Sequence, residues 1–237
     1  MGLENRVAVV TGATGNLGRV VAKHFAEQGA RLALFGTNAE KLENLAHELN
    51  LSADRVLSHV VDLRNTEATK AAAITVMAKF GRVDILLNLV GGWTGGKSIG
   101  EFVASEVDKM LQQHLWTTFH LAQAFVPHLV ANRWGRVIVV SSPTATHPPA
   151  HASPYAIAKA AQEALMLTLA QELKNSGVTA NILQVKTIDA QHERNRERTP
   201  KNASWTTPEE IAATILYLCS DEAQVVNGAR IPLYGAP

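Results

Sequence analysis

Short runs of consecutive apolar residues alternate along this chain with longer segments in which apolar residues recur every three or four positions. Uninterrupted apolar runs are typical of strands buried on both faces, and the three-to-four spacing is typical of amphipathic helices. The runs predict strands at 6–10, 31–35, 56–61, 83–87, 136–141, 178–185 and 229–233. The longer segments predict helices at 17–28, 40–49, 66–80, 153–174 and 207–218, with one long helix or two shorter ones over 101–130.

The regular alternation of strand and helix sets the expected fold class. Strands that are apolar on both faces need helices on both sides of the sheet, so we expect an α/β fold with a doubly wound, mostly parallel sheet of the Rossmann type. No linker, low-complexity tract or short-period repeat divides the chain. We therefore expect one domain over residues 1–237, a usual length for a single domain.

Composition narrows the classes of partner. Lys plus Arg number 22 and Asp plus Glu number 21, a balance that indicates neither nucleic acid nor an anionic membrane as a partner. The residues before the first strand lack the apolar core of a signal peptide, and no apolar run is long enough to span a bilayer. The single cysteine, Cys219, excludes an internal disulfide and is expected to be a buried, inert thiol. We expect a soluble cytoplasmic protein that acts on a small molecule.

A glycine-rich turn joins the first strand to the first helix. Its sequence is Thr11-Gly12-Ala13-Thr14-Gly15-Asn16-Leu17-Gly18. Glycines let the backbone turn tightly and approach a pyrophosphate, and the following helix N-terminus offers free N–H groups to the anion. The alternative is a turn that only packs the helix on the strand. The position of the turn in the first strand–helix unit favours a dinucleotide site.

Several candidate residues fall where ligands bind in such folds. Ligands of open parallel sheets lie beyond the carboxyl ends of the strands. The predicted strands end at or next to Gly12, Asp62, Asn88 and Ser142. Tyr155 opens the helix after the fifth strand, so we expect all five residues to share one crevice.

Tyr155 and Lys159 are four residues apart, a spacing that stacks two side chains on one face of a helix. A free phenol titrates near ~10. An ammonium beside it stabilises the phenolate and lowers that pKa, so that a tyrosine can act as a general acid or base. Ser142 ends an apolar strand and can hydrogen-bond the oxygen on which charge develops. Because this spacing also occurs by chance in helices, the assignment depends on the preceding motifs.

Together these motifs resemble the short-chain dehydrogenase/reductase family over nearly the whole chain. Ser142, Tyr155 and Lys159 match its catalytic serine, tyrosine and lysine, Asp62-Leu63 resembles its adenine contact, and the turn at 88–91 resembles its central turn. The resemblance implies an NAD(P)-dependent oxidoreductase that transfers a hydride between a nicotinamide cofactor and a carbonyl or alcohol substrate.

The resemblance also implies roles for individual residues. Tyr155 would exchange the proton, Lys159 would lower its pKa and hold the ribose, and Ser142 would steady the substrate oxygen. The cofactor-binding residues that it implies are Thr11, Gly12, Thr14, Gly15, Asn16, Leu17, Gly18, Thr37, Asp62, Leu63, Asn88, Gly91, Tyr155, Lys159 and Ile188. It further implies a homodimer or homotetramer built on 101–130 and 153–174.

Four places depart from the family pattern. Asn16 stands where glycine is common, Leu89-Val90 replaces Asn-Ala in the central turn, and Val185-Lys186 replaces Pro-Gly after the sixth strand. His114 occupies the place of the fourth catalytic residue, an asparagine. It either relays protons through water or fills space with one satisfied ring nitrogen. A non-catalytic nucleotide-binding or nucleotide-sensing protein is therefore an alternative, which the intact catalytic trio opposes.

Three short stretches are similar to dihydropteridine reductases, short-chain proteins that reduce a quinonoid pterin. They lie at 91–96, 115–117 and 204–206. Trp93 either stacks on a flat substrate ring or packs as an ordinary loop residue. Ser142 and the neutral Phe35-Gly36-Thr37 do not match those enzymes.

The residues after the second strand bear on the choice of cofactor. A carboxylate there binds the ribose 2′-hydroxyl and selects NAD, whereas Gly36-Thr37-Asn38 is neutral. Thr37 and Asn38 can donate hydrogen bonds to a 2′-phosphate, although no arginine or lysine stands beside them. We expect NADP(H), with NAD(H) as the alternative.

The polar run at 192–198 lies where the family has a mobile lid over the substrate. We expect a solvated loop in which Arg194 and Arg196 are candidates for contact with an acidic substrate. The nine histidines are scattered, and Pro148-Pro149 breaks the helix that would align His147 with His151. No metal site is therefore expected.

One pattern points to a different class of function. Gly91, Gly96, Lys97 and Ser98 match the phosphate loop of ATP- and GTP-hydrolysing proteins and follow a strand. The helix of a phosphate loop begins at the Lys-Ser pair, whereas Gly100 interrupts the pattern here. No later predicted strand clearly ends in a magnesium-binding aspartate. We interpret the match as chance.

Overall fold

Seven strands form one sheet in the order β3-β2-β1-β4-β5-β6-β7 in the computed structural model, which describes residues 2–235. The strands are β1 (Val7–Thr11), β2 (Arg31–Gly36), β3 (Val56–Val60), β4 (Ile85–Asn88), β5 (Gly135–Ser141), β6 (Val178–Gln184) and β7 (Arg230–Pro232). Every neighbouring pair in this sheet runs parallel. The predicted doubly wound α/β class is confirmed.

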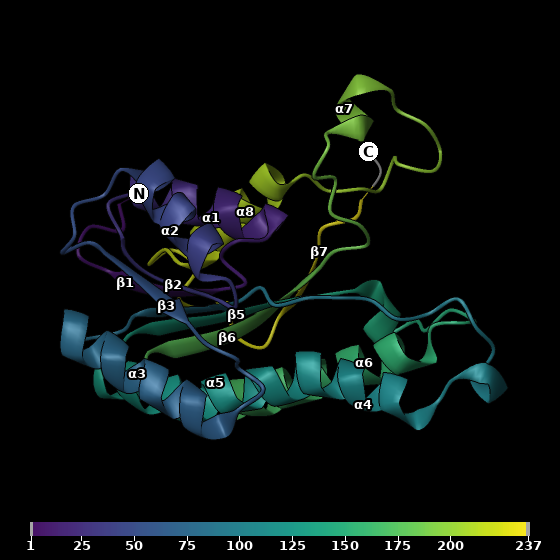
Figure 1. Ribbon diagram of the computed structural model, residues 1–237, viewed down its shortest axis with the longest axis horizontal. Helices are drawn as coiled ribbons and strands as arrows, with labels where there is room; N and C mark the ends of the chain where they lie inside the picture. Colours follow the sequence, from purple (N-terminus) through teal and green to yellow (C-terminus); the bar gives the residue numbers. More distant parts are fainter. Residues whose placement is uncertain (1, 236–237) are drawn as a thin grey trace.

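Helices cover both faces of the sheet (Figure 1). One face carries α1 (Asn16–Glu27), α2 (Ala39–Leu49) and α8 (Pro208–Leu218). The other carries α3 (Thr66–Phe80), α4 (Ala104–Leu111), α5 (Thr117–Ala131) and α6 (Ser153–Glu172). Since strands buried on both faces must be apolar throughout, the uninterrupted apolar runs of the sequence follow from this layering.

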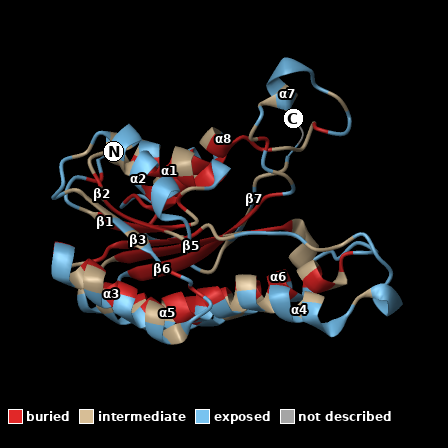
Figure 2. Cartoon of the chain, in the orientation of Figure 1, coloured by how far each residue is buried: buried red, intermediate tan, exposed pale blue. Residues whose placement is uncertain are grey.

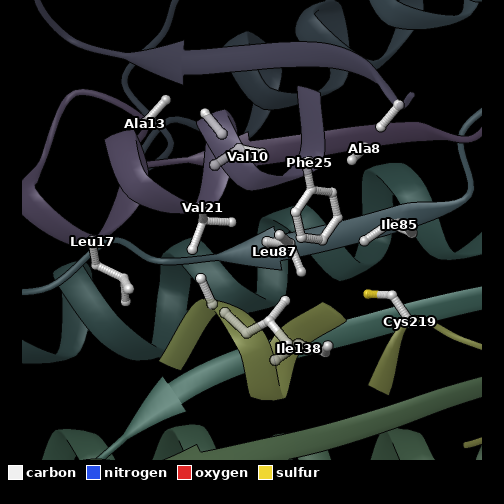
Figure 3. Close-up of a cluster of buried hydrophobic side chains, with 14 of the residues drawn as sticks. Ala8, Val10, Ala13, Leu17, Val21, Phe25, Ile85, Leu87, Ile138 and Cys219 are labelled. Carbon is white, nitrogen blue, oxygen red and sulfur yellow. The ribbon is translucent and has the colours of Figure 1, made fainter. Parts of the chain in front are cut away.

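Successive side chains of the central strands enter opposite halves of the core. Ala8 and Val10 of β1 belong to the cluster under α1 and α8, whereas Val7 and Val9 belong to the cluster on the other face. This division follows from the two-residue period of a strand. Figure 3 shows the first cluster, in which Phe25 of α1 packs near strand residues. Figure 2 shows that the sheet forms the buried centre of the protein.

The winding direction reverses between β1 and β4. The chain first builds outward through β2 and β3 and then returns to place β4 on the other side of β1. Thr11 and Asn88, the last residues of these two strands, are partners in register. Ligands of doubly wound folds bind in the crevice that such a reversal opens at the carboxyl edge.

The segment 101–130 is two α-helices joined by a π-helical turn. A short 3₁₀ turn, η1 (Ile99–Glu101), comes first, and the π-helical turn, η2 (Gln112–Trp116), connects α4 to α5. A π turn inserts an extra residue into a helix and is frequent at functional sites. His114 lies in this turn. The periodicity of the sequence alone had not decided between one long helix and two shorter ones.

The run at 192–198 contains a short helix, α7 (Glu193–Arg196), where the sequence predicted only a loop. The carboxylate of Asp189 accepts hydrogen bonds from the backbone N–H groups of Glu193 and Arg194 at 2.8 and 2.9 Å. These bonds satisfy free N–H groups of the first turn. The sequence did not reveal this helix, because the carboxylate that stabilises its first turn lies four residues before it, outside the charge-rich run.

Cys219 lies buried beside α8 as a free thiol. Burial raises its pKa to about 12, because the apolar surroundings disfavour the thiolate. The prediction of a buried, inert thiol is confirmed. Among the helices of residues 2–235, none combines the length and the apolarity that crossing a bilayer requires.

Candidate active site

The glycine-rich turn is packed too closely for side chains at two positions. Gly12 has a φ of +60°, and a Cβ on it would lie 3.1 Å from the carbonyl oxygen of Leu89. A Cβ on Gly18 would lie 2.2 Å from the carbonyl oxygen of Gly12. Glycine is therefore required at both positions to bring α1 against the end of β1.

The first turn of α1 is open to an anion. Gly15 precedes the helix and provides no side-chain cap, and the first turn contains no acidic residue. Its free N–H groups and the positive end of the helix dipole attract negative charge. This turn therefore fits a pyrophosphate group.

Asn88 links the two strands that flank the crevice. Its Oδ1 accepts a hydrogen bond from Thr11 Oγ1 at 2.9 Å, and its Nδ2 donates to Thr118 Oγ1 at 2.8 Å. The Thr11 hydroxyl also accepts from the backbone N–H of Leu89 at 3.1 Å. Asn88 and Thr11 thereby hold the glycine turn and the 88–91 turn in place, although Leu89 departs from the family pattern.

A cavity of about 490 Å³ collects the predicted catalytic residues above the carboxyl edge of the sheet. We call it the Tyr155 cavity. It is lined by Leu17, Leu89, Val90, Gly91, Gly92, Trp93, His114, Val140, Ser141, Ser142, Thr144, Tyr155, Lys159, Val185, Lys186, Thr187 and Ile188. Of the five residues predicted to share one crevice, Ser142 and Tyr155 line this cavity.

Lys159 is buried and held by two acceptors. Its Nζ donates to the carbonyl oxygen of Val140 at 2.7 Å and to Gln162 Oε1 at 2.9 Å. Gln162 in turn donates through Nε2 to Thr118 Oγ1 at 2.9 Å, and that hydroxyl donates to the carbonyl oxygen of His114 at 2.6 Å. A continuous set of hydrogen bonds therefore connects the lysine on α6 with the π turn.

The electrostatics of Lys159 and Tyr155 are dominated by burial. Burial lowers the pKa of Lys159 to about 7, opposed by the negative charge of Glu163. Burial also raises the pKa of Tyr155, opposed by a hydrogen bond with Ser142. The ammonium nitrogen lies 5.9 Å from the centre of the Tyr155 ring. The two side chains adjoin as predicted, but the pKa of Tyr155 is raised rather than lowered, because desolvation of the phenolate outweighs the hydrogen bond with Ser142 and Lys159 is not among the causes of the shift.

His114 is fully buried and faces Tyr155 edge-on, with ring centres 5.6 Å apart. Its Nε2 lies 3.1 Å from the carbonyl oxygen of Gly92 and must carry the proton, because a carbonyl only accepts. Its Nδ1 has no partner among the described residues. Burial is the main cause that lowers its pKa, to about 3, with Lys159 adding to the effect. The ring is therefore neutral at ordinary pH.

A second cavity, of about 370 Å³, continues the crevice toward β2 and β3. We call it the Thr37 cavity, and Val90 lines both. It is lined by Gly12, Thr14, Phe35, Gly36, Thr37, Val61, Asp62, Leu63, Arg64, Val90, Lys109, Gln113 and Thr117. Asp62 forms an ion pair with Arg64 at 2.7 Å, and hydrogen bonds from Arg64 are the main cause that lowers the pKa of Asp62.

Two predicted substrate residues lie outside the Tyr155 cavity. Arg194 donates to the carbonyl oxygen of Trp205 at 2.6 Å and pairs with Glu210 at 2.5 Å. Arg196 lines a different pocket, beside Trp205. The sequence suggested both as substrate contacts from their position in the run at 192–198, whereas the contacts of Arg194 hold α7 against α8 and the residues that precede it. Trp93 does line the Tyr155 cavity, with 63% of its surface exposed.

The phosphate-loop match does not form a phosphate loop. No α-helix starts at Lys97 and Ser98; Ser98 caps only the short η1 turn. Lys97 forms an ion pair with Glu106 at 3.0 Å. Within residues 2–235, no three His, Cys, Asp or Glu side chains are grouped as metal ligands.

Sequence reasoning missed several residues of the site. Gln162 stands three residues after Lys159 on one helix, a spacing that predicts contact. Arg64 follows Asp62 closely enough to have suggested the ion pair. Lys109 reaches the Thr37 cavity from α4 through tertiary packing, which no local signal reveals.

Comparison with known proteins agrees with this geometry. Residues 6–201 match the sequence profile of the short chain dehydrogenase family. The chain is 32% identical to "(2S)-[(R)-hydroxy(phenyl)methyl]succinyl-CoA dehydrogenase subunit BbsD" of Thauera aromatica, over 99% of this chain and 97% of that protein. It is 27% identical to "3-oxoacyl-[acyl-carrier-protein] reductase FabG" of Thermotoga maritima, over 99% and 98% of the two chains.

Solved structures show the same likeness. The crystal structure of gox2181 superposes with a TM-score of 0.87 at 25% identity, covering 98% of this chain and 95% of that one. A short chain dehydrogenase from Bacillus anthracis superposes with a TM-score of 0.85 at 27% identity, with the same coverage. The chain thus belongs to the short-chain dehydrogenase/reductase family and is an NAD(P)-dependent oxidoreductase.

Proposed function

We propose that this oxidoreductase interconverts a carbonyl compound and its alcohol, with Tyr155 as the general acid and base. The observation that carries the proposal is the meeting of Ser142, Tyr155 and Lys159 in one cavity, with Lys159 anchored to β5 through Val140. A general acid must lie within hydrogen-bond reach of the atom that it protonates. Both hydroxyls line the same cavity, so one carbonyl oxygen can meet them together.

The residues of the crevice fit a nicotinamide dinucleotide, which when bound supplies the hydride. The close packing at Gly12 and Gly18 and the open first turn of α1 suit its pyrophosphate. Tyr155 donates its proton to the substrate oxygen, and Ser142 donates a hydrogen bond to that oxygen. Lys159, in its charged form, stabilises the phenolate left behind and has a third N–H for a ribose hydroxyl. Leu17, Gly91 and Ile188 line the cavity around these groups.

A screen of substrates tests the reaction. Purified protein is offered ketones, oxo acids, quinones and a quinonoid dihydropterin with NADPH or NADH, and loss of nicotinamide absorbance is followed. We expect turnover of at least one carbonyl compound and its abolition in Tyr155→Phe. The pterin is included because the exposed ring of Trp93 lines the cavity and suits a flat substrate. Binding of nicotinamide without turnover of any compound would favour the nucleotide-sensing alternative.

We infer that NADP(H) is the preferred cofactor. Thr37 places no carboxylate at the end of β2, and Lys109 adds a cation to the lining of the Thr37 cavity, in which Arg64 is paired with Asp62. Cations at this end of the crevice strengthen the binding of a 2′-phosphate, and a carboxylate there weakens it. The measurement is kcat/KM for NADPH against NADH with one substrate. An equal or lower value for NADPH would remove this assignment.

We propose that the protein forms a homodimer or homotetramer through α4, α5 and α6. Large apolar side chains are exposed along these helices and their flanks: Val103, Trp116, Phe119, Val130 and Ile157. Exposed apolar side chains gathered on a few helices are a feature of interfaces. Light scattering on a sizing column should show a multiple of the chain mass, and Phe119→Glu should shift the population toward monomer. A wild-type monomer at assay concentration would contradict the proposal.

We also propose a cytoplasmic location. The one thiol, Cys219, is buried and unpaired, which fits a reducing compartment. Fractionation of the source cells with marker enzymes tests this. Recovery with a secreted or membrane fraction would exclude it.

A further inference from the structure

The Tyr155 cavity has an unbalanced charge. Its lining includes two lysines, Lys159 and Lys186, and no aspartate or glutamate. His114, the other basic side chain of the lining, is neutral because its pKa is about 3. A cavity with cations and no carboxylate favours an anionic ligand.

The two lysines differ in what they contact. Lys159 is buried and committed to Val140 and Gln162. Lys186 is exposed, and across residues 2–235 it takes part in none of the ion pairs or side-chain hydrogen bonds of the structure. The closest carboxylate along the chain, Asp189, is buried and receives two backbone N–H groups of α7. Lys186 therefore retains a cation for a ligand.

The backbone holds Lys186 next to the catalytic serine. Ser141 and Gln184 are partners in the β5–β6 register, and the N–H of Val185 donates to the carbonyl oxygen of Ser141 at 3.0 Å. Just beyond Lys186, the carbonyl oxygen of Thr187 accepts from Thr206 at 3.0 Å. The lysine thus lies between two backbone anchors, two residues beyond the end of β6, beside the strand that leads into Ser142.

We propose that Lys186 selects the substrate by binding a carboxylate, so that the enzyme acts on oxo acids or the corresponding hydroxy acids in preference to neutral ketones. This inference rests on the proposed function of the same cavity. The carbonyl lies at Ser142 and Tyr155, and the carboxylate of the same molecule lies toward Lys186. With Lys186 in this role, an acidic substrate does not need Arg194, which is paired with Glu210.

One other anion competes for Lys186, namely a phosphate of the dinucleotide. The two sources of negative charge give different results. A contact with cofactor changes the dissociation constant of NADPH and affects every substrate equally. A contact with substrate changes only the compounds that carry a carboxylate.

The test compares a free 3-oxo acid with its methyl ester in wild type, Lys186→Met and Lys186→Arg. Met keeps the length of the apolar stem and removes the charge, and Arg keeps the charge. We expect wild type to favour the acid, and Lys186→Met to lose about five- to tenfold in kcat/KM for the acid, the scale of a partly exposed ion pair. The ester should change by less than about twofold, and Lys186→Arg should restore most of the acid activity. Lys174→Met, an exposed lysine outside the cavity, is the matched control.

Three results would overturn the inference. The first is an equal loss for acid and ester, and the second is weaker NADPH binding by fluorescence titration in Lys186→Met. Turnover of the ester without preference for the acid would also exclude the role of Lys186 while leaving the proposed function intact. If no carbonyl compound is turned over, the proposed function fails. In that case a thermal-shift assay still decides the role of Lys186. The 3-oxo acid should raise the melting temperature of the NADP-loaded wild type but not that of NADP-loaded Lys186→Met.

Discussion

The two cavities of the crevice hold their charges in different ways. In the Tyr155 cavity, Lys159 is buried and hydrogen-bonded on two sides, and its pKa falls to about 7. In the Thr37 cavity, the Asp62–Arg64 ion pair is solvated, with side chains 46% and 61% exposed. Burial amplifies every charge interaction, whereas solvent screens it. The Tyr155 cavity should therefore respond strongly to single substitutions, and the Thr37 cavity should respond weakly.

The largest expected effect is at Tyr155. Tyr155→Phe removes the proton that the substrate oxygen needs and should lower kcat by about 10²-fold or more. The dissociation constant of NADPH should change little, because the ring remains. Steady-state turnover and fluorescence titration measure the two quantities separately. A variant that kept near wild-type turnover would show that the acid lies elsewhere in the cavity.

Gln162 should produce the next largest effect, although it does not line the cavity. Gln162→Met removes one of the two acceptors of Lys159 and breaks the link through Thr118 to the π turn. A buried donor that loses its partner is costly, so we expect about a tenfold loss in kcat. Gln171→Met, on the exposed side of α6, is the matched control. An unchanged kcat in Gln162→Met would leave Val140 as the only anchor that matters.

The pH dependence separates positioning from simple packing. If charged Lys159 is the active form, turnover falls as pH rises through its pKa, near 7. Gln162→Glu places a carboxylate where an amide oxygen lies 2.9 Å from the ammonium, which favours the charged form and raises that pKa. The fall in kcat should therefore move to higher pH in Gln162→Glu. A profile that stayed in place would mean that Lys159 does not set this limb.

The sequence predicted the geometry of the crevice better than its electrostatics. Strand ends are local features, and the runs that end at Gly12 and Ser142 were sufficient to place these two residues in adjoining cavities of one crevice. Asn88, at the end of the run between them, bonds to Thr11. The pKa of Tyr155 was predicted in the wrong direction, because the desolvation that raises it depends on everything packed around the phenol. The spacing of two residues along a helix indicates that their side chains adjoin, but it does not indicate how far those side chains are removed from water.

The run at 192–198 shows the same limit of prediction from sequence. Arg194 and Arg196 were assigned to substrate from their position in the run, yet Arg194 is held by Trp205 and Glu210. Long charged side chains reach several partners, so their contacts depend on tertiary placement. The lysine that does line the cavity, Lys186, was visible in the sequence only as a departure from a family pattern.

Arg64 should show the weaker response expected of the Thr37 cavity. Arg64→Gln removes a cation that lines the pocket but is well solvated, so the KM for NADPH should rise by only about three- to fivefold. The KM for NADH, which lacks the 2′-phosphate, is the internal control and should not change. Added salt should reduce the difference between the cofactors in wild type, because screening acts on exposed charges. A larger loss than that at Gln162 would reverse the ranking of the two cavities.

The smallest effect is expected at His114, although it is fully buried and lines the Tyr155 cavity. Its ring is neutral with a pKa of about 3, and its one bound proton is used on the carbonyl oxygen of Gly92. A group with that pKa is a poor proton donor or acceptor near neutral pH, where the best catalytic pKa matches the working pH. His114→Asn restores the residue type of the family and should keep kcat within about threefold, with an unchanged pH profile, whereas loss of an acid or base costs about 10²-fold or more. A loss of that size would assign His114 to proton transfer and would mean that its unpartnered Nδ1, rather than its hydrogen-bonded Nε2, performs the chemistry.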